Sequence, residues 1–239
     1  ECLRLYGEKI PSTRPGFQVE ISREPLGVVG IISPWNFPIA IPAWKAAPAM
    51  MCGNAVILKP ASLTIGSAVA LTEIISKQDI PKGLFNLVLG SGSDIGHKIA
   101  VHPEIAAISF TGSVQTGRQL YKDASSTMKK MQMEMGSKNP LIVMDDADLK
   151  TAITCAVNGA YGGTGQKCTA SSRLIVHENI YKKFIDGLVE NIKNLKVGHA
   201  LDEGTQMGPV SSQSQFDSNL KYVDICLLYT SPSPRDLAV

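Results

Sequence analysis

Short apolar runs rich in β-branched residues alternate along the chain with longer stretches whose apolar residues recur at helical spacing. This alternation is typical of βαβ units, in which helices cover a mostly parallel sheet. The expected strands are residues 26–32, 55–59, 84–89, 105–110, 141–144 and 173–177. The expected helices include residues 63–77, 149–161 and 181–195, and Asp148 is placed to cap the second of them. The sequence therefore predicts a doubly wound α/β fold.

Two glycine-containing turns follow consecutive expected strands. They are GSGSDIG (residues 90–96) and FTGSVQTG (residues 110–117), and in the second Ser113 is placed to cap a helix. Ligands of doubly wound sheets bind where strands end and helix N-termini present free N–H groups. A single turn of this kind is more often only a tight turn. Two of them together indicate a dinucleotide site, with Gly112 and Ser113 near the pyrophosphate.

The composition argues against several classes of protein. The net charge of +2 over 239 residues offers no basic surface for a nucleic acid. No apolar run approaches the roughly 20 residues that span a bilayer, and the N-terminal residues lack the pattern of a signal peptide. The five cysteines are scattered and have no histidine at metal-ligand spacing. We therefore expect a cytoplasmic protein without a metal site or a disulfide framework, which binds neither nucleic acid nor a membrane.

One cysteine has unusual surroundings. Cys168 lies in GGTGQKCTASSR (residues 162–173), among glycines and small hydroxyl residues. A structural cysteine usually behaves as a small buried hydrophobe, and inertness is the default interpretation of a lone thiol. Small neighbours instead leave room for a substrate to approach the sulfur, which suits a nucleophile.

Five motifs occur in a fixed order: PWNFP (residues 34–38), LKPAS (58–62), FTGS (110–113), MEMGSKNP (133–140) and GQKC (165–168). In this order and at these distances they resemble the aldehyde dehydrogenase superfamily, over about residues 26–224. The residues of the last two motifs are most similar to those of the semialdehyde branch, in particular to those of α-ketoglutaric semialdehyde (2,5-dioxovalerate) dehydrogenases.

The resemblance implies NAD(P)-dependent oxidation of a small aldehyde, here a semialdehyde, to the carboxylic acid. Cys168 would attack the carbonyl and carry the thiohemiacetal and then the thioester. Asn36 and the backbone N–H of Cys168 would stabilise the oxyanion, and Glu134 would be the base that activates water. The neighbours Met133 and Met135 are expected to desolvate the Glu134 carboxylate.

The resemblance also implies a Rossmann-like site for NADP or NAD. Its expected residues are Ile32, Pro34, Trp35, Lys59, Ser62, Gly90, Phe110, Thr111, Gly112, Ser113, Met135 and Gly136. Many NAD-specific members carry glutamate at the position of Ser62, so serine there favours NADP at least as much as NAD. Two plainer interpretations remain, in which Ser62 only caps a helix and Lys59 is a solvated strand end.

The same resemblance implies that the chain is a fragment, and we expect it to be truncated at both ends. Residues 1–134 are expected to be the NAD(P)-binding domain without its N-terminal part, and residues 135–225 the start of the catalytic domain. Residues 226–239 are expected to be a non-native tail, because residues 226–236 resemble translated adapter sequence. The fragment is expected to be inactive and the full-length enzyme to be a homo-oligomer.

Two other functions stay open from the sequence. A thiol hydrolase would use Cys168 as nucleophile, His177 as base and Gln166 as oxyanion donor. A nucleotide-binding fragment without catalysis would explain the glycine turns but not Cys168, Glu134 and Asn36.

Overall fold

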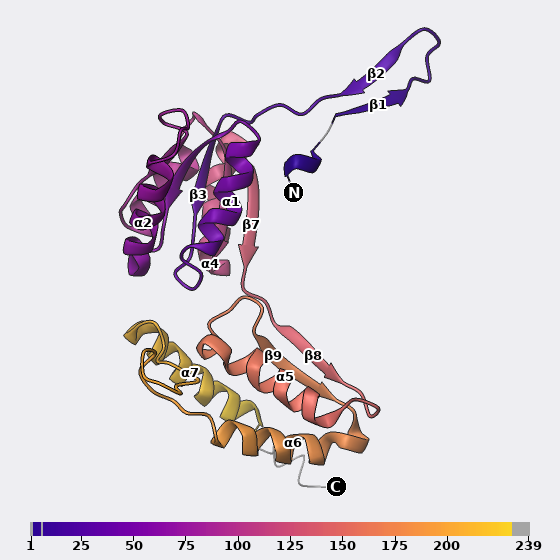
Figure 1. Ribbon diagram of the computed structural model, residues 1–239, viewed down its shortest axis with the longest axis vertical. Coiled ribbons are helices and arrows are strands. Elements are labelled where there is room, and N and C mark those ends of the chain that lie inside the picture. Colours follow the sequence, from indigo (N-terminus) through magenta and orange to yellow (C-terminus); the bar gives the residue numbers. More distant parts are fainter. Residues whose placement is uncertain (1, 6, 231–239) are drawn as a thin grey trace. The chain divides into compact units, whose positions relative to one another are not determined.

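The chain forms two structural units, Glu1–Gly136 and Ser137–Val239 (Figure 1). The computed structural model describes residues 2–5 and 7–230. The first unit is built on the parallel strands β3 (Val28–Ile32), β4 (Ala55–Lys59), β5 (Phe85–Leu87), β6 (Ile105–Gly112) and β7 (Lys130–Met135). Their order in the sheet is β5-β4-β3-β6-β7, so the direction of winding reverses between β3 and β6. This is the doubly wound, Rossmann-like fold that the sequence predicts.

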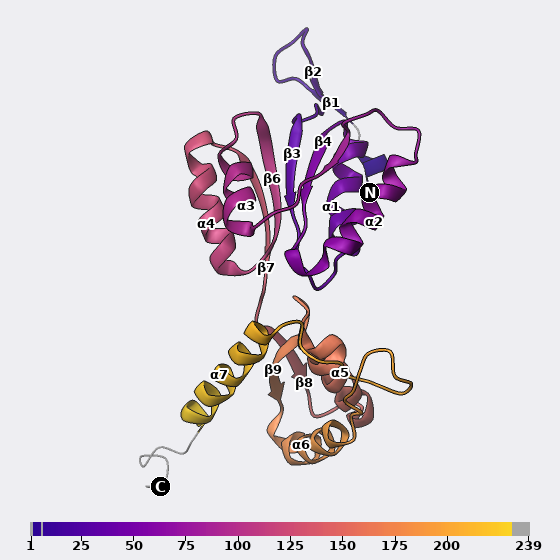
Figure 2. The ribbon, with the colours of Figure 1, turned by 90° about the vertical axis from the view of Figure 1, so that its left-hand side faces the viewer.

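Helices cover both faces of this sheet. They are α1 (Ala40–Met51), α2 (Ile65–Ser76), α3 (Gly92–Val101) and α4 (Val114–Ala124). Figure 2 shows α1 and α2 on one face and α3 and α4 on the other. Successive side chains of a strand point to opposite faces, so Ile31 packs in the core with α1 and α2 while Ile32 packs with α3 and α4. Burial on both faces explains why these strands read as continuous apolar runs.

The second unit has a smaller sheet. Its parallel strands are β8 (Asn139–Val143) and β9 (Ser171–Val176), and its helices are α5 (Leu149–Tyr161), α6 (Glu178–Lys193) and α7 (Gln213–Thr230). The fully buried Phe184 of α6 packs in one core with Val143 of β8 and Ala156 of α5. Asp148 caps α5 as expected, because its Oδ1 accepts a hydrogen bond of 2.8 Å from the backbone N–H of Thr151.

The expected elements are present, with shifted ends that have local causes. β3 begins two residues late because Gly27, with a φ of 112°, ends the preceding turn. The helix expected at residue 181 begins at Glu178, since His177 caps it. Within residues 2–5 and 7–230, none of the helices combines the length and apolar character that crossing a membrane requires. Of the expected tail, Cys226 to Thr230 belong to α7, and residues 231–239 lie outside the described part of the chain.

Several elements were not expected. β1 (Glu8–Pro11) and β2 (Gln18–Ile21) form an antiparallel hairpin that is exposed along its whole length, including its apolar residues Ile10, Val19 and Ile21. Helix α1 was not expected because it is apolar and contains Pro48, so its sequence shows no clear helical spacing of apolar and polar residues. Short 3₁₀ helices are η1 (Cys2–Arg4), η2 (Ser62–Thr64), η3 (Ser125–Thr127) and η4 (Gly162–Gly165).

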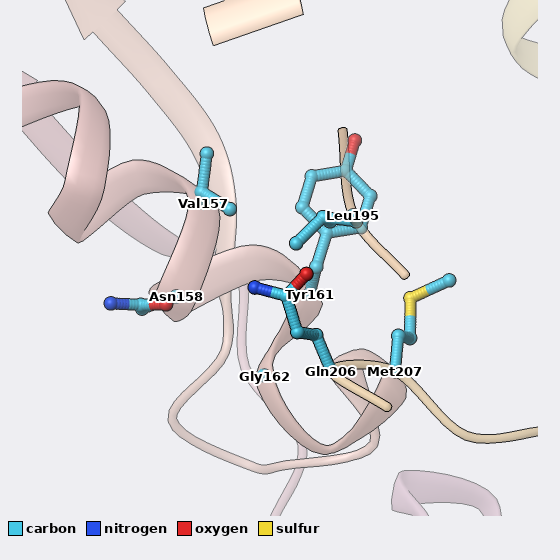
Figure 3. Close-up of a pocket in the computed structure, with 7 residues that line it drawn as sticks. All are labelled: Val157, Asn158, Tyr161, Gly162, Leu195, Gln206 and Met207. Carbon is cyan, nitrogen blue, oxygen red and sulfur yellow. The ribbon is translucent and has the colours of Figure 1, made fainter. Parts of the chain in front are cut away.

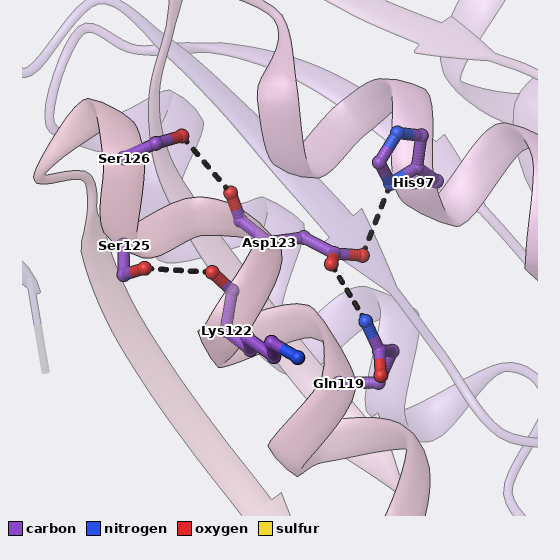
Figure 4. A network of polar contacts seen from close by, with 6 residues as sticks. All are labelled: His97, Gln119, Lys122, Asp123, Ser125 and Ser126. Atoms are coloured by element: carbon purple, nitrogen blue, oxygen red, sulfur yellow. Dashed lines mark hydrogen bonds and ion pairs between the residues drawn. The ribbon is translucent and has the colours of Figure 1, made fainter.

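A polar network ties α3 to α4 (Figure 4). His97 Nδ1 lies 3.0 Å from Asp123 Oδ2, and Gln119 donates to Asp123 Oδ1 over 2.7 Å. The hydrogen bond from His97, with help from Gln119, holds the pKa of Asp123 below its usual value. The ionised carboxylate is therefore favoured in the folded unit.

We expect Asp123→Asn to lower the free energy of unfolding by about 1–2 kcal/mol at pH 6, because a charge-assisted network is lost. The lowered pKa means that this contribution is present above pH ~4 and disappears as Asp123 becomes protonated at lower pH. Urea denaturation at pH 6 and pH ~3 checks both statements. Asp94→Asn is the matched control, because it removes a carboxylate of α3 whose exposed pair with Lys98 and position in the first helical turn are each worth less, about 0.3–1 kcal/mol. Equal losses in the two variants would contradict the assignment.

Candidate active site

The carboxyl ends of the strands form one edge of the first sheet, and the sheet register aligns predicted site residues along it. Ile32 at the end of β3 lies between Lys59 of β4 and Phe110 of β6. One residue further along β6, Thr111 lies opposite Glu134 of β7. This edge includes the point between β3 and β6 where the winding reverses, which is where ligands of such sheets bind.

Two helices begin at the same edge. Ser91 caps α3 by accepting a hydrogen bond of 3.1 Å from the N–H of Asp94. Ser113 caps α4, as expected, by accepting one of 3.2 Å from the N–H of Thr116. The N-terminus of a helix attracts phosphate groups through its free N–H groups and its dipole.

The expected glycines of these turns have no room for a side chain. Gly90 has a φ of 154°, and a Cβ there would lie 2.6 Å from Cγ1 of Ile95. A Cβ on Gly112 would lie 2.6 Å from Cζ of Phe110, whose ring is buried beneath the edge. Both turns therefore require glycine, because a larger residue would collide with Ile95 or with Phe110.

Lys59 is not a solvated strand end, which was one interpretation of the sequence. It is 4% exposed, and its Nζ donates to the carbonyl oxygen of Pro60 over 2.9 Å. Burial lowers the pKa of Lys59. Next to it, the buried hydroxyl of Ser33 has no hydrogen-bond partner among the described residues, although its backbone N–H donates to the carbonyl of Lys59. The edge therefore holds a buried cation and a buried hydroxyl that can still bind a polar group.

Ser62 does not act as a helix cap. It is exposed and is the first residue of η2, and neither η2 nor α2 has a side-chain hydrogen bond at its cap. Pro34, Trp35 and Asn36 lie half-buried in the loop between β3 and α1. Gly136 is exposed and ends the first unit.

The surroundings of Glu134 differ from the expectation. The side chains of Met133 and Met135 pack in the core with α3 and α4, because strand alternation turns them to the face opposite Glu134. Glu134 is exposed, and its Oε1 accepts a hydrogen bond of 3.0 Å from Gln132 Nε2. The expected desolvation by two methionines is therefore wrong, and an amide is the neighbour of this carboxylate.

A lysine outside the five motifs completes this polar face. Lys45 extends from α1, and its Nζ donates to Ser109 Oγ over 2.8 Å and to Gln132 Oε1 over 2.7 Å. Burial lowers the pKa of Lys45 to about 8, and the charge of Glu134 acts in the opposite direction. An ionisable amine and a carboxylate thus lie on one face at the edge where the predicted cofactor residues gather.

In the second unit, Cys168 is exposed in the loop between η4 and β9. The turn before it is left-handed at Gly163, Thr164 and Gly165, with φ values of 63°, 60° and 67°. Asn139 Nδ2 donates to the carbonyl of Cys168 over 2.7 Å and to that of Ala170 over 3.0 Å. Asn139, which belongs to the MEMGSKNP motif, therefore anchors the loop that presents the thiol.

The geometry of the second unit opposes the thiol hydrolase. The carbonyl of Cys168 is bound by Asn139 at the start of β8, whereas the N–H of His177 donates to Val143 at its end. The intervening strand β9 spans roughly 16 Å at 3.3 Å per residue. His177 Nδ1 also accepts from the N–H of Asn179. A Cys168–His177 pair therefore cannot form in this fold.

The second unit also contains a pocket of about 260 Å³ (Figure 3). It is lined by Val157, Asn158, Tyr161, Gly162, Leu195, Gln206 and Met207. None of these is a predicted site residue, and the volume is below that of typical ligand pockets. Among the described residues, no group of three His, Cys, Asp or Glu side chains is placed to hold a metal ion.

Comparison with known proteins gives consistent results. Residues 1–227 match the aldehyde dehydrogenase family. The chain is 45% identical over 224 residues to an α-ketoglutaric semialdehyde dehydrogenase of Bacillus subtilis, covering 94% of this chain and 46% of that protein. It is 43% identical to a 2,5-dioxopentanoate dehydrogenase of Saccharolobus solfataricus, over 93% of this chain and 47% of that protein. The chain thus spans about half the length of these relatives.

Among solved structures, betaine aldehyde dehydrogenase of Staphylococcus aureus in complex with NAD⁺ is similar, with a TM-score of 0.92 and 37% identity. The similarity covers 96% of this chain and 46% of that one. The motifs that carried the resemblance now lie on a matching fold, and the match extends over nearly all of the chain. The chain belongs to the aldehyde dehydrogenase family.

Proposed function

We propose that the full-length protein containing this chain is an NAD(P)-dependent aldehyde dehydrogenase. The observation that carries the proposal is the alignment of Glu134 with the predicted cofactor residues along one sheet edge, which includes the point where the winding reverses. Ligand-binding edges of this kind are where doubly wound enzymes place their chemistry. The exposed thiol of Cys168, on a loop fixed by Asn139, supplies the nucleophile.

In the proposed mechanism, Cys168 attacks the aldehyde carbonyl and forms a tetrahedral thiohemiacetal. The side-chain amide of Asn36 and the backbone N–H of Cys168 donate hydrogen bonds to the resulting oxyanion. Loss of a hydride from the thiohemiacetal carbon would leave a thioester on Cys168, and the nicotinamide cofactor would supply the acceptor for that hydride. Glu134 then takes a proton from the water that hydrolyses the Cys168 thioester, and the carboxylic acid leaves.

The residues present fit a dinucleotide. The capped N-termini of α3 and α4, each preceded by a glycine turn, suit the pyrophosphate. Lys59 is proposed to donate to a ribose, and Ile32 at the end of the neighbouring strand β3, which lies between Lys59 and Phe110, is proposed to line the same site. Met135 and Gly136, which end the first unit, are proposed to lie near the nicotinamide side.

The names of two relatives suggest the substrate. Both the Bacillus subtilis and the Saccharolobus solfataricus proteins are named for the same keto-semialdehyde. We propose a semialdehyde with a distal carboxylate as the substrate class. Assay of the full-length protein with a panel of semialdehydes and neutral aldehydes, following reduced cofactor by absorbance, tests this. Absence of cofactor reduction with every aldehyde would overturn the proposed activity, and a preference for neutral aldehydes would overturn the substrate class.

We expect the full-length protein to use NADP at least as readily as NAD, because Ser62 provides an exposed hydroxyl and no carboxylate to repel a 2′-phosphate. Ser62→Glu should weaken the use of NADP selectively by about 1–3 kcal/mol, the scale of one charge-assisted hydrogen bond. The measurement is kcat/KM for both cofactors in both proteins. Ser67→Glu, which introduces the same carboxylate on α2, is the control and should leave the ratio of kcat/KM for the two cofactors unchanged. An unchanged ratio of the two cofactors in Ser62→Glu would exclude this role.

A further inference from the structure

The amide side chain of Gln132 lies between a lysine and the proposed base. It extends from β7 two residues before Glu134, so both side chains stand on the face that α1 covers. Its cross-strand neighbour on β6 is Ser109. Gln132 of β7 is therefore in contact with side chains from α1 and from β6, two elements that precede it in the sequence.

The orientation of this amide is determined by its partners. Gln132 Oε1 accepts a hydrogen bond of 2.7 Å from Lys45 Nζ and one of 2.5 Å from Ser109 Oγ. An ammonium group can only donate, so the oxygen of the amide must face Lys45. The NH₂ group is then turned toward Glu134, to which it donates over 3.0 Å. Flipping the amide would place its NH₂ group against the lysine and its oxygen against the carboxylate, which removes these hydrogen bonds.

Glu134 needs such a partner because it is exposed on its strand. A glutamate side chain has several rotatable bonds and loses rotamer freedom when it is ordered. A base must lie within hydrogen-bond reach of the water that it activates, so a freely rotating carboxylate is rarely in position. A donor that is itself held by two groups can restrict the rotamers of Glu134.

We propose that Gln132 is a positioning residue, held by Lys45 and Ser109, that orients the Glu134 carboxylate for hydrolysis of the thioester. The inference rests on the proposed role of Glu134 as base. Gln132 does not touch the reacting atoms in this scheme. It acts only on the step in which Glu134 takes a proton from water.

The test separates that step from the earlier ones in the full-length protein. Gln132→Met keeps the length of the side chain and removes both the acceptor and the donor. We expect the burst of reduced cofactor to keep its rate and amplitude, while steady turnover falls about tenfold, the effect of one hydrogen bond to a charged group. Intact-mass analysis during turnover should show the acyl adduct on Cys168 accumulating. Ser109→Ala removes one of the two donors to Gln132 and should lower turnover about threefold.

Gln119→Met is the matched control, because it removes an amide that binds only Asp123 on α4. It should leave both phases unchanged. Equal turnover in Gln132→Met and wild type would overturn the proposal. So would a lower burst that accompanies lower turnover and a lower melting temperature, because that pattern indicates a general loss of structure. If Gln132→Met does not fold, Ser109→Ala decides by the same two phases. Normal turnover in Glu134→Gln would instead overturn the proposed function, so the two failures are distinguishable.

Discussion

Cys168→Ala is expected to abolish aldehyde oxidation in the full-length protein, with turnover lower by at least about 10⁴-fold, as for other nucleophiles that carry a covalent intermediate. Binding of the cofactor should stay nearly intact, because the cofactor residues proposed here lie in the first unit and Cys168 lies in the second. The variant has no thiol to form a thiohemiacetal, so no later step can follow. Stopped-flow measurement of reduced cofactor and titration of cofactor binding by fluorescence check the two parts.

Cys155→Ala is the control for this experiment. Cys155 is also a free, exposed thiol of the second unit, on α5. Its loss should leave turnover at the wild-type rate. Turnover retained by Cys168→Ala, or lost equally in both variants, would exclude Cys168 as the nucleophile.

Glu134→Gln is expected to form up to one equivalent of reduced cofactor and then to stall. The glutamine keeps the size of the side chain but cannot take a proton from water, so the thioester on Cys168 persists. General base catalysis of this kind typically contributes 10²–10⁴-fold, and steady turnover should fall by about that factor. Intact-mass analysis of the stalled protein should show the acyl group as added mass on Cys168.

Glu104→Gln is the matched control, since Glu104 is exposed and directly precedes β6, at the amino edge of the same sheet. It should behave as the wild type. Steady turnover near the wild-type rate in Glu134→Gln would remove Glu134 from the role of base.

The sequence predicted the elements whose signal is local. Strands β3, β4 and β6 are buried on both faces, so each reads as a short apolar run that requires no knowledge of its neighbours. The caps Ser113 and Asp148 were predictable for the same reason, because a cap acts on a backbone group three residues away. Strand β7 carries a period-two pattern of methionine and polar residues that could have identified it.

The contacts of the candidate site were not predictable from the sequence, because they join residues far apart along the chain. Lys45 lies 64 residues before Ser109 and 87 before Gln132, and only the packing of α1 on the sheet brings them together. The expectation that Met133 and Met135 desolvate Glu134 was wrong because it treated residues adjacent in the sequence as adjacent in space. In a strand, adjacent side chains face opposite directions. The same rule would have placed Gln132 beside Glu134.

The crowding at Gly112 restricts how this family member can change. A Cβ at this position would lie 2.6 Å from the ring of Phe110, only two residues earlier. The buried ring of Phe110 therefore requires glycine at position 112. An alanine at Gly112 is compatible only with a smaller residue in place of Phe110, which leaves a cavity in the core below. Positions 110 and 112 are therefore expected to change together.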